Sequence, residues 1–434
     1  MTEVLRFEFS ADGAHRRGAG WQRLSNDDFR DASDRLDDLL ELAGSAPNWA
    51  FDLLQVARAV YLVDKRSLRK HAADGWTRTI ELAVRLIEPQ RWGGAQLTEL
   101  NALLGMLTGD RWSISVHGGA QQNPQSRFDF GRAGEVALFS GGLDSTAYAA
   151  HAARRGGDRL LLLAFDDFLR HRQHGIAHRI RRLDAREISL RQVGQTVIGD
   201  PVGARLESSS RSRGFLYTTS AVCVAAAHRL SVVSVPENGQ LAVNPPLTPS
   251  RLSALSTRSV HPWTLALLNR IIGGIGGNLR VVNPLLAYTK GEVCALALDA
   301  GLDRRTLELT ISCANPRGKR FTGYDNCGFC FPCLVRRAGL LHAIGADSSE
   351  YRYNPADLMV GKTRSRDLRA IIHWLSTSFG LRDLIADSPF PAEIPPPAVL
   401  PMLRRGRNEL SAMVDCLLPK NHSLRRQWTL SKTQ

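Results

Sequence analysis

The chain has 434 residues, of which 43% are hydrophobic and 23% are charged, so it is long enough for about three domains. Its 56 Lys and Arg outnumber 42 Asp and Glu, a net charge of +14 that excludes an acidic solvating chain. The ordinary apolar content also excludes a disordered polyelectrolyte. The positive charge is consistent with a phosphate-rich partner, and equally with an Arg-rich composition that forms no binding patch.

Seven cysteines are too few for a disulfide scaffold, and four of them crowd into one short stretch. Residues 1–9 alternate apolar and charged side chains and lack the apolar core of a signal peptide. No apolar run approaches the ~18–20 residues that cross a bilayer. These features predict a cytoplasmic protein with reduced thiols and no membrane segment.

Residues 1–117 are predicted to form an N-terminal α+β domain. Strand-like alternation occurs at 4–9, at 80–86 and around 112–116, and leucines at helical spacing lie around 36–40. Residues 118–133 are rich in Gly, Gln, Asn and Arg without a period, which predicts a linker. No catalytic motif stands out in this domain, and we expect it to dock a partner.

From residue 134 to 345, strand and helix patterns alternate. Buried-strand runs at 136–139 and 160–165 frame a helical stretch at 144–154. Further strands are expected at 188–193, 231–235 and 279–282, and further helices at 215–227, 261–272 and 289–300. Thr289 and Glu292 have the spacing of a capping box, which marks a helix start. This order predicts an α/β, Rossmann-like doubly wound parallel sheet that binds its ligand at the carboxyl ends of the strands.

Residues 346–434 are predicted to form a mostly helical C-terminal extension. Six prolines between 389 and 401 predict that this stretch is an extended connector.

The loop between the strand at 136–139 and the next helix carries the clearest chemical signal. It contains Ser140, Gly141, Gly142, Leu143, Asp144 and Ser145. Glycines let the backbone approach phosphate oxygens, and the amides at the helix start attract an anion. Asp144 would repel a bare phosphate, so its expected role is to hold Mg²⁺ between phosphates. The loop therefore predicts an ATP site with Mg²⁺, and the missing Gly-Lys-Ser/Thr excludes a Walker A motif.

The cysteine cluster consists of Cys313 followed, after thirteen residues, by Cys327, Cys330 and Cys333. Four thiolates satisfy a tetrahedral Zn²⁺ with no open position, which favours a structural zinc knuckle. The C-x₂-C-x₂-C spacing also occurs in iron–sulfur proteins, which leaves a cluster as the competing interpretation.

The loop matches all fixed positions of the SGGxDS fingerprint and so resembles the pyrophosphate-loop ATP pyrophosphatases. With the cysteines about 170 residues later, residues 135–345 resemble the QueC family, the 7-cyano-7-deazaguanine synthases. Ser312, Arg336 and the Lys290-Gly291-Glu292 helix start also match this family, whereas Gly214 after Arg213 replaces its Asn. The resemblance implies an adenine nucleotide alpha hydrolase-like fold, with Lys290 and Arg213 as candidates to neutralise phosphates.

The resemblance also implies a reaction. Such an enzyme adenylates 7-carboxy-7-deazaguanine, releases pyrophosphate, and passes the activated carboxylate to ammonia to give an amide and then a nitrile. Glu237 or Asp166 would accept hydrogen bonds from the guanine-like edge. The family's Tyr-Pro-Asp-Cys segment is absent, and residues 236–239 and 256–262 differ from it.

Long chains with such a centre and added flanks resemble QatC, the QueC-like component of Qat antiphage systems. That likeness implies a different acceptor amine, such as the N-terminus of a partner protein encoded in the same operon, docked by the terminal regions.

Three alternatives stay open. The basic run at 170–182 is consistent with a nucleic-acid modifying enzyme acting on tRNA, or with a solvated helix beside the nucleotide site. A housekeeping 7-cyano-7-deazaguanine synthase of queuosine biosynthesis is the second. A non-catalytic assembly protein is the third, although the intact fingerprint argues against it.

Overall fold

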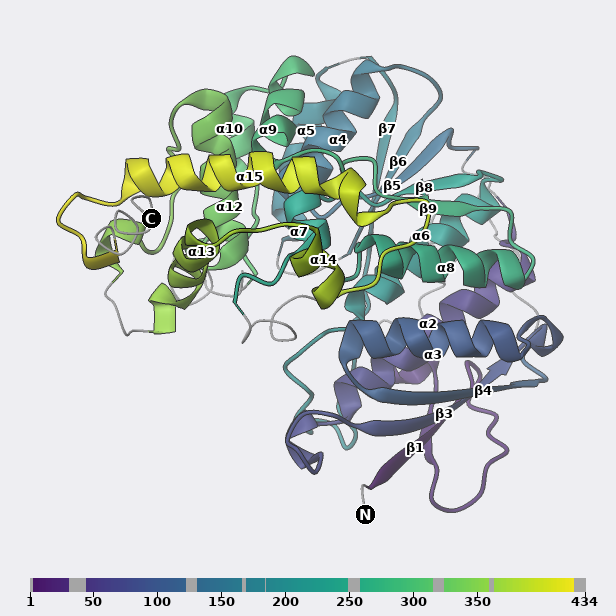
Figure 1. The fold of residues 1–434 in the computed structure, drawn as a ribbon. Helices are drawn as coiled ribbons and strands as arrows, with labels where there is room; N and C mark the ends of the chain where they lie inside the picture. The colour runs from purple at the N-terminus through teal and green to yellow at the C-terminus, as the bar shows by residue number, and fades with distance from the viewer. Residues whose placement is uncertain are drawn as a thin grey trace.

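The computed structural model describes residues 3–30, 44–121, 131–165, 169–183, 185–248, 258–314, 324–358 and 363–424. The helix expected around 36–40, most of the expected linker, Asp166 and the last ten residues lie outside the described residues. The described chain contains two parallel sheets and a group of C-terminal helices (Figure 1). None of its helices has the length and apolar character needed to span a membrane.

The N-terminal unit is a four-stranded sheet in the order β2-β1-β3-β4, with every neighbouring pair parallel. Its strands are β1 (Val4–Phe9), β2 (Gln22–Leu24), β3 (Thr79–Leu86) and β4 (Arg111–Gly118). Parallel neighbours need crossover connections, and here α2 (Asn48–Arg66) and α3 (Gly94–Thr108) supply two of them. The expected strands are present, and their parallel pairing makes this unit α/β rather than α+β in architecture.

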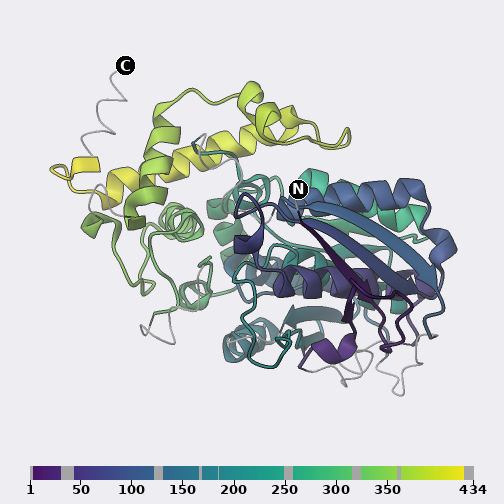
Figure 2. The same ribbon diagram turned by 90° about the horizontal axis from the view of Figure 1, so that it is seen from below.

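One face of this sheet packs on α2 and α3. Alternate residues of β3, such as Ile80, Leu82 and Val84, are buried there in a continuous apolar core. The opposite face turns away from the rest of the molecule (Figure 2). Helix α2 is buried on nearly all sides because it also packs on α6 of the central unit, and α3 packs on α8 in the same way.

The central unit contains a five-stranded parallel sheet in the order β7-β6-β5-β8-β9. Its strands are β5 (Glu135–Leu138), β6 (Leu160–Phe165), β7 (Ile188–Val193), β8 (Val232–Ser234) and β9 (Arg280–Val282). The chain moves outward from β5 to β7 and then returns to build β8 and β9 on the other side. The direction of winding therefore reverses between β5 and β8, which confirms the predicted doubly wound α/β fold.

Helices cover both faces of this sheet. One face packs on α6 (Arg213–Ala227) and α8 (Pro262–Gly274), the other on α4 (Leu143–Arg154), α5 (Arg170–Arg181) and α9 (Lys290–Asp299). All six residues of β6 are buried, as expected for a central strand covered on both sides. Shorter or later helices of the unit are α7 (Gly239–Val243), α10 (Arg304–Leu309) and α12 (Phe331–Ile344).

The C-terminal region is helical, as predicted. It contains α13 (Arg366–Ser376), α14 (Leu381–Asp387) and α15 (Pro396–Leu417), and α15 runs across α7, α9 and α12 (Figure 1). The prediction of an extended proline connector is wrong from residue 396 onward. Pro396 and Pro397 occupy the first turn of α15, where no intrahelical donor is needed, and Pro401 lies within the helix.

Candidate active site

The glycine-rich loop lies at the carboxyl end of β5, where the winding reverses. Gly141 has φ +72°, a conformation that disfavours any residue with a Cβ, and a Cβ there would lie 3.1 Å from Cγ of Gln173. A Cβ on Gly142 would lie 3.0 Å from the backbone oxygen of Ile311. The Ser140 and Ser145 hydroxyl oxygens are 3.2 Å apart, and Ser140 accepts a hydrogen bond from the Gly142 amide at 3.1 Å. The loop is thus tightly folded by its own side chains.

Asp144, in the first turn of α4, forms a buried ion pair with Lys290 of α9. The Lys290 Nζ lies 2.8 Å from each Asp144 oxygen, and the Lys290 side chain is 1% exposed. These residues are 146 positions apart in the sequence. The fold therefore joins the two motifs that were singled out separately.

Two residues that follow β8 complete the cluster. Asn238 donates to Asp144 at 2.9 Å while its own side-chain oxygen caps α7. Glu237 shares a hydrogen bond with Asp144. Asn283, directly after β9, accepts from the Glu237 amide and donates to the Glu237 carbonyl at 3.1 and 2.8 Å. The ends of β5, β8 and β9 thus converge on one polar centre.

The two carboxyl groups titrate differently. Burial raises the pKa of Asp144, but the charge of Lys290 and the surrounding hydrogen bonds outweigh burial and hold it below its ordinary value. Burial, and then the adjacent negative charge of Asp144, raise the pKa of Glu237 well above its ordinary value. Of the two carboxyl groups, Glu237 therefore holds a proton more readily than Asp144.

The backbone around Lys290 is fixed by several helices. Thr289 forms the predicted capping box with Glu292, and the Lys290 amide donates to the Gln240 side chain of α7 at 2.9 Å. From α15, Glu409 accepts a hydrogen bond from the Gly291 amide at 3.1 Å and another from the Thr289 hydroxyl.

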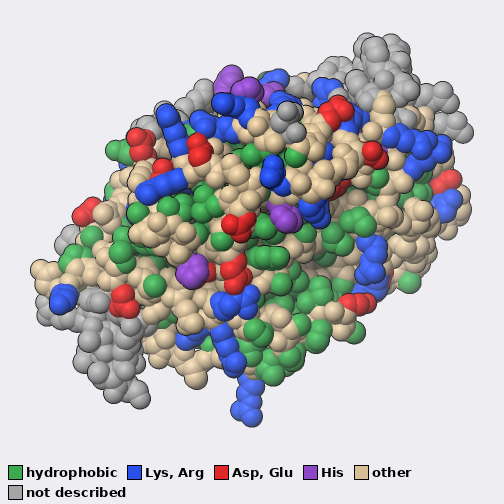
Figure 3. All heavy atoms as spheres, turned by 90° about the horizontal axis from the view of Figure 1, so that it is seen from above, with side chains coloured by type: hydrophobic (Ala, Val, Ile, Leu, Met, Phe, Trp, Pro, Cys, Tyr) green, Lys and Arg blue, Asp and Glu red, His purple; other side chains and the backbone are tan. Residues whose placement is uncertain are grey.

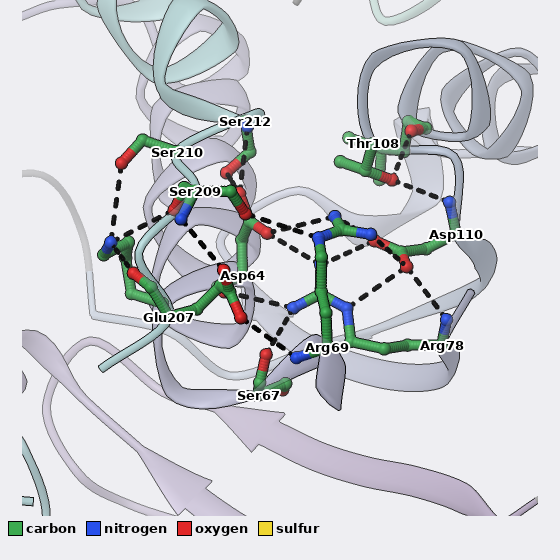
Figure 4. Close-up of polar contacts among 12 residues, drawn as sticks. Asp64, Ser67, Arg69, Arg78, Thr108, Asp110, Glu207, Ser209, Ser210 and Ser212 are labelled. Atoms are coloured by element: carbon green, nitrogen blue, oxygen red, sulfur yellow. Dashed lines mark hydrogen bonds and ion pairs between the residues drawn. The ribbon is translucent and has the colours of Figure 1, made fainter. Parts of the chain in front are cut away.

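The second cation predicted to neutralise phosphates is Arg213. It is exposed at the start of α6, and its guanidinium carbon is 5.8 Å from the centre of the Tyr217 ring. The preceding residue, Ser212, donates both its amide and its hydroxyl to Asp64 of α2, at 3.0 and 2.8 Å. Figure 4 shows that Asp64 belongs to a buried charge network with Arg69, Arg78 and Asp110. The N-terminal unit therefore holds the start of α6.

The four cysteines converge as predicted. Their sulfurs all lie within 4.8 Å of one another, and those of Cys327 and Cys333 are 3.9 Å apart. Tetrahedral ligands at the usual Zn–S length of about 2.3 Å have sulfurs about 3.8 Å apart, so the donor set fits one Zn²⁺. An iron–sulfur cluster distributes its cysteines over several iron ions and would separate them further. Arg336 is fully buried and ties α12 to the end of α10 by donating to Leu307, Glu308 and Thr310.

The basic run of α5 is partly satisfied within the chain. Arg172 pairs with Asp325, Arg179 donates to Thr306 at 3.4 Å, and Arg181 donates to the Ile188 carbonyl at 2.9 Å. Figure 3 views the side that carries α5 and α10, where Lys and Arg alternate with acidic and uncharged side chains. This face shows no unbroken basic patch, and the nucleic-acid hypothesis stays a prediction.

The structure thus brings Asp144 and Lys290 together beside the loop residues Ser140–Ser145 and gathers the four cysteines in a second cluster. The role expected for Arg213 stays a prediction. Glu237 bonds to Asp144 rather than standing free for a base edge. Sequence reasoning missed Asn238, Gln240 and Glu409. Of these three, only Asn238 could have been recognised from the sequence, because an Asn after a strand and before a helix is a common helix N-cap.

Known proteins resemble part of this chain. A family model described as "Queuosine biosynthesis protein QueC" matches residues 265–344, which include Lys290 and all four cysteines. The 7-cyano-7-deazaguanine synthase of Syntrophobacter fumaroxidans is 26% identical over 239 residues, 50% of this chain and 95% of the relative. That of Cellvibrio japonicus is 28% identical over 237 residues, 50% of this chain and 97% of the relative. The Ralstonia nicotianae enzyme is 36% identical over 91 residues, 20% of this chain and 37% of the relative.

Half of the chain is therefore homologous to 7-cyano-7-deazaguanine synthases, which are enzymes. The Syntrophobacter fumaroxidans and Cellvibrio japonicus relatives are matched over almost their whole length, so the remaining half of this chain is additional to them.

Proposed function

We propose that this protein is an ATP-dependent ligase that adenylates the carboxylate of a 7-carboxy-7-deazaguanine-type substrate. The observation that carries the proposal is the buried Asp144–Lys290 pair beneath the glycine loop, in a chain half of which is homologous to 7-cyano-7-deazaguanine synthases. Its position at the reversal of the sheet is where ligands bind in open α/β folds.

The loop amides and the start of α4 would bind the ATP phosphates. A carboxylate oxygen of the substrate attacks the α-phosphorus, the bond to the bridging oxygen of the β-phosphate breaks, and pyrophosphate leaves with that electron pair. Lys290 compensates the developing negative charge, and Asn238 and Glu237 hold Asp144 in place. Asp144 would offer an oxygen ligand of the kind that Mg²⁺ prefers, and bound Mg²⁺ would neutralise phosphate charge.

In the second half-reaction, an amine nitrogen attacks the adenylated carbonyl carbon. AMP leaves with its bonding pair, the nitrogen loses a proton, and an amide results. With ammonia as acceptor, a second activation would remove the amide oxygen and give a nitrile. We propose an amine of a partner protein, such as its N-terminus, as the acceptor, in a role in antiphage defence. The support is the half of the chain that lies beyond the matched relatives, together with the altered segments 236–239 and 256–262.

The cysteine cluster would have a structural role rather than a catalytic one. Cys313, Cys327, Cys330 and Cys333 would together occupy all four positions of a Zn²⁺ ion, which leaves no site for substrate. The ion would hold Cys313 and Cys327 against the start of α12.

The test replaces Asp144 by Asn, which keeps the shape and removes the charge. We expect pyrophosphate release from Mg-ATP in the presence of 7-carboxy-7-deazaguanine to fall by about 100- to 1000-fold. Asp299→Asn, at the exposed far end of α9, is the matched control and should retain activity. Wild-type rates in Asp144→Asn would contradict the assigned site. Mass spectrometry of the products separates the acceptors, because a free nitrile indicates ammonia and a mass increase on a partner protein indicates ligation.

A further inference from the structure

We infer that Glu409, in the C-terminal helix α15, is a positioning residue for Lys290. This inference rests on the proposed function, because it assigns Glu409 a part in the site built around Lys290 and Asp144. It means that α15 belongs to the active-site structure, although it lies outside residues 265–344, where the family model matches.

Glu409 contacts the residues on both sides of Lys290. One of its carboxylate oxygens accepts from the Thr289 hydroxyl, and the other accepts from the Gly291 amide at 3.1 Å. The Thr289 oxygen also accepts from the Glu292 amide at 3.2 Å, so the capping hydroxyl has a defined donor and acceptor. The Lys290 amide is bound in turn by Gln240. The backbone that carries Lys290 is therefore held at three consecutive residues.

Close packing removes the remaining freedom of this turn. A Cβ on Gly291 would lie 2.5 Å from a Glu409 oxygen and 2.6 Å from Cδ2 of His342, and a Cβ on Gly339 would lie 2.5 Å from Cγ of Lys290. The Lys290 stem thus passes directly over a glycine of α12. The ammonium group at its end lies 2.8 Å from both Asp144 oxygens.

Two further residues of helix α15 contact this region. Gly406, one turn before Glu409, lies against Gln240, where a Cβ would be 2.4 Å from the amide nitrogen. Arg405 donates to Glu292 at 2.6 Å and to the Ala287 carbonyl at 2.9 Å. One face of α15 therefore contacts both α7, which is capped by Asn238, and α9, which begins at Lys290.

The chemistry of Glu409 also indicates positioning rather than simple packing. The residue is only 4% exposed, and burial raises the pKa of its carboxyl group. A buried carboxylate costs free energy that an apolar side chain would not. The desolvation free energy of Glu409 is partly offset because its carboxyl group faces the start of α9, where backbone amides and the helix dipole favour negative charge.

The experiment compares Glu409→Ala, which removes both acceptors, with Glu409→Gln, which keeps one carbonyl oxygen. Asn408→Ala, the neighbouring exposed residue on α15, is the control. We expect kcat for pyrophosphate release to fall by about 10- to 100-fold in Glu409→Ala, with KM for ATP changed much less, because binding groups of the loop stay in place. Glu409→Gln should recover much of the loss, and Asn408→Ala should match the wild type.

Hydrogen exchange supplies a readout that does not depend on activity. In Glu409→Ala the amides of the first turn of α9 should exchange faster, whereas those of α4 should not. Wild-type kcat in Glu409→Ala together with unchanged exchange at Gly291 would overturn the inference. A wild-type protein without pyrophosphate release would instead refute the proposed function, and the exchange measurement would then still decide whether Glu409 holds the turn.

Discussion

At the residue scale, the candidate site is a small set of buried charges that compensate one another. Lys290 and Asn238 hold the pKa of Asp144 below its ordinary value despite burial, whereas burial and the charge of Asp144 raise the pKa of Glu237. Removing one member of such a set leaves the others buried without a partner, which is why single substitutions there are expected to be severe.

The site residues that belong to a short local motif could be identified from the sequence. The loop around Asp144 and the helix start at Lys290 follow fixed spacings, so each could be identified alone. Gln240 and Glu409 could not, because each is an isolated polar residue whose partner is brought to it by packing between helices far apart in the chain. Arg213 was proposed from the resemblance to a known family, and its expected role in neutralising phosphates stays a prediction.

A pH dependence of stability follows from His228, which is buried at the end of α6. Its Nδ1 accepts from the Ala133 amide at 3.0 Å, and burial lowers its pKa to about 4. Below the ordinary histidine pKa of about 6.5 the unfolded chain binds a proton that the folded protein excludes, so stability falls as pH drops from about 6.5 toward 4.

The variant His228→Asn retains an acceptor near the same position and cannot titrate. Between about pH 6.5 and 5 the wild type should lose about 2 kcal/mol more unfolding free energy than this variant, as measured by urea denaturation. His373→Asn, on the exposed face of α13, serves as the control. Equal pH profiles for wild type and His228→Asn would show that this histidine does not couple folding to protons.

At the element scale, strands and helices of the central unit were predictable because each carries its own period. The fully apolar run of β6 and the capping box of α9 are local signals of this kind. The proline-containing start of helix α15 was not predicted, because proline content alone cannot distinguish the first turn of a helix from an extended segment. Its later residues, such as Leu403 and Leu410, are buried against neighbouring helices and carry the helix past Pro401.

The cysteine knuckle is an element whose stability should depend on a metal. We expect about one zinc ion per chain in the purified protein. The variant Cys333→Ser should lose zinc and melt several degrees lower, because binding free energy of a structural ion is folding free energy. Metal analysis and thermal denaturation provide the measurements, with the exposed Cys416→Ser as the control. Iron with acid-labile sulfide, or full zinc content in Cys333→Ser, would contradict the assignment.

At the scale of the whole molecule, the N-terminal unit is joined to the central unit by a shared apolar core and by buried charges. Helices α2 and α3 pack on α6 and α8, and Asp64 links Arg78 to Ser212. The sequence suggested a separate docking domain because composition indicates where a domain ends but not how it packs against the next one. The structure shows that this unit supports the start of α6, and the docking of a partner by it stays a prediction.

This joint should contribute strongly to stability. Asp64→Ala would leave Arg78 buried with one anionic partner fewer, and we expect a loss of about 3–5 kcal/mol in unfolding free energy. The exposed pair Arg6–Glu81 offers a matched control, since Glu81→Ala should cost at most about 1 kcal/mol. Similar small effects of both substitutions in chemical denaturation would show that the charge network does not hold the two units together.

The overall charge of +14 is explained in part at this scale. Arginines serve internal roles, as Arg78, Arg336 and Arg405 do, and the face that carries α5 alternates in sign. Net charge therefore says little about a nucleic-acid partner here, whereas the length beyond the matched relatives points to the part of the molecule that sets its particular role.

The central claim is that the substrate carboxylate attacks the α-phosphorus of ATP. The most direct test labels the carboxylate of 7-carboxy-7-deazaguanine with ¹⁸O and follows the label by mass spectrometry during turnover with Mg-ATP and an amine. We expect AMP to acquire one ¹⁸O atom and pyrophosphate to acquire none. Label in inorganic phosphate together with ADP, or AMP without label, would contradict it.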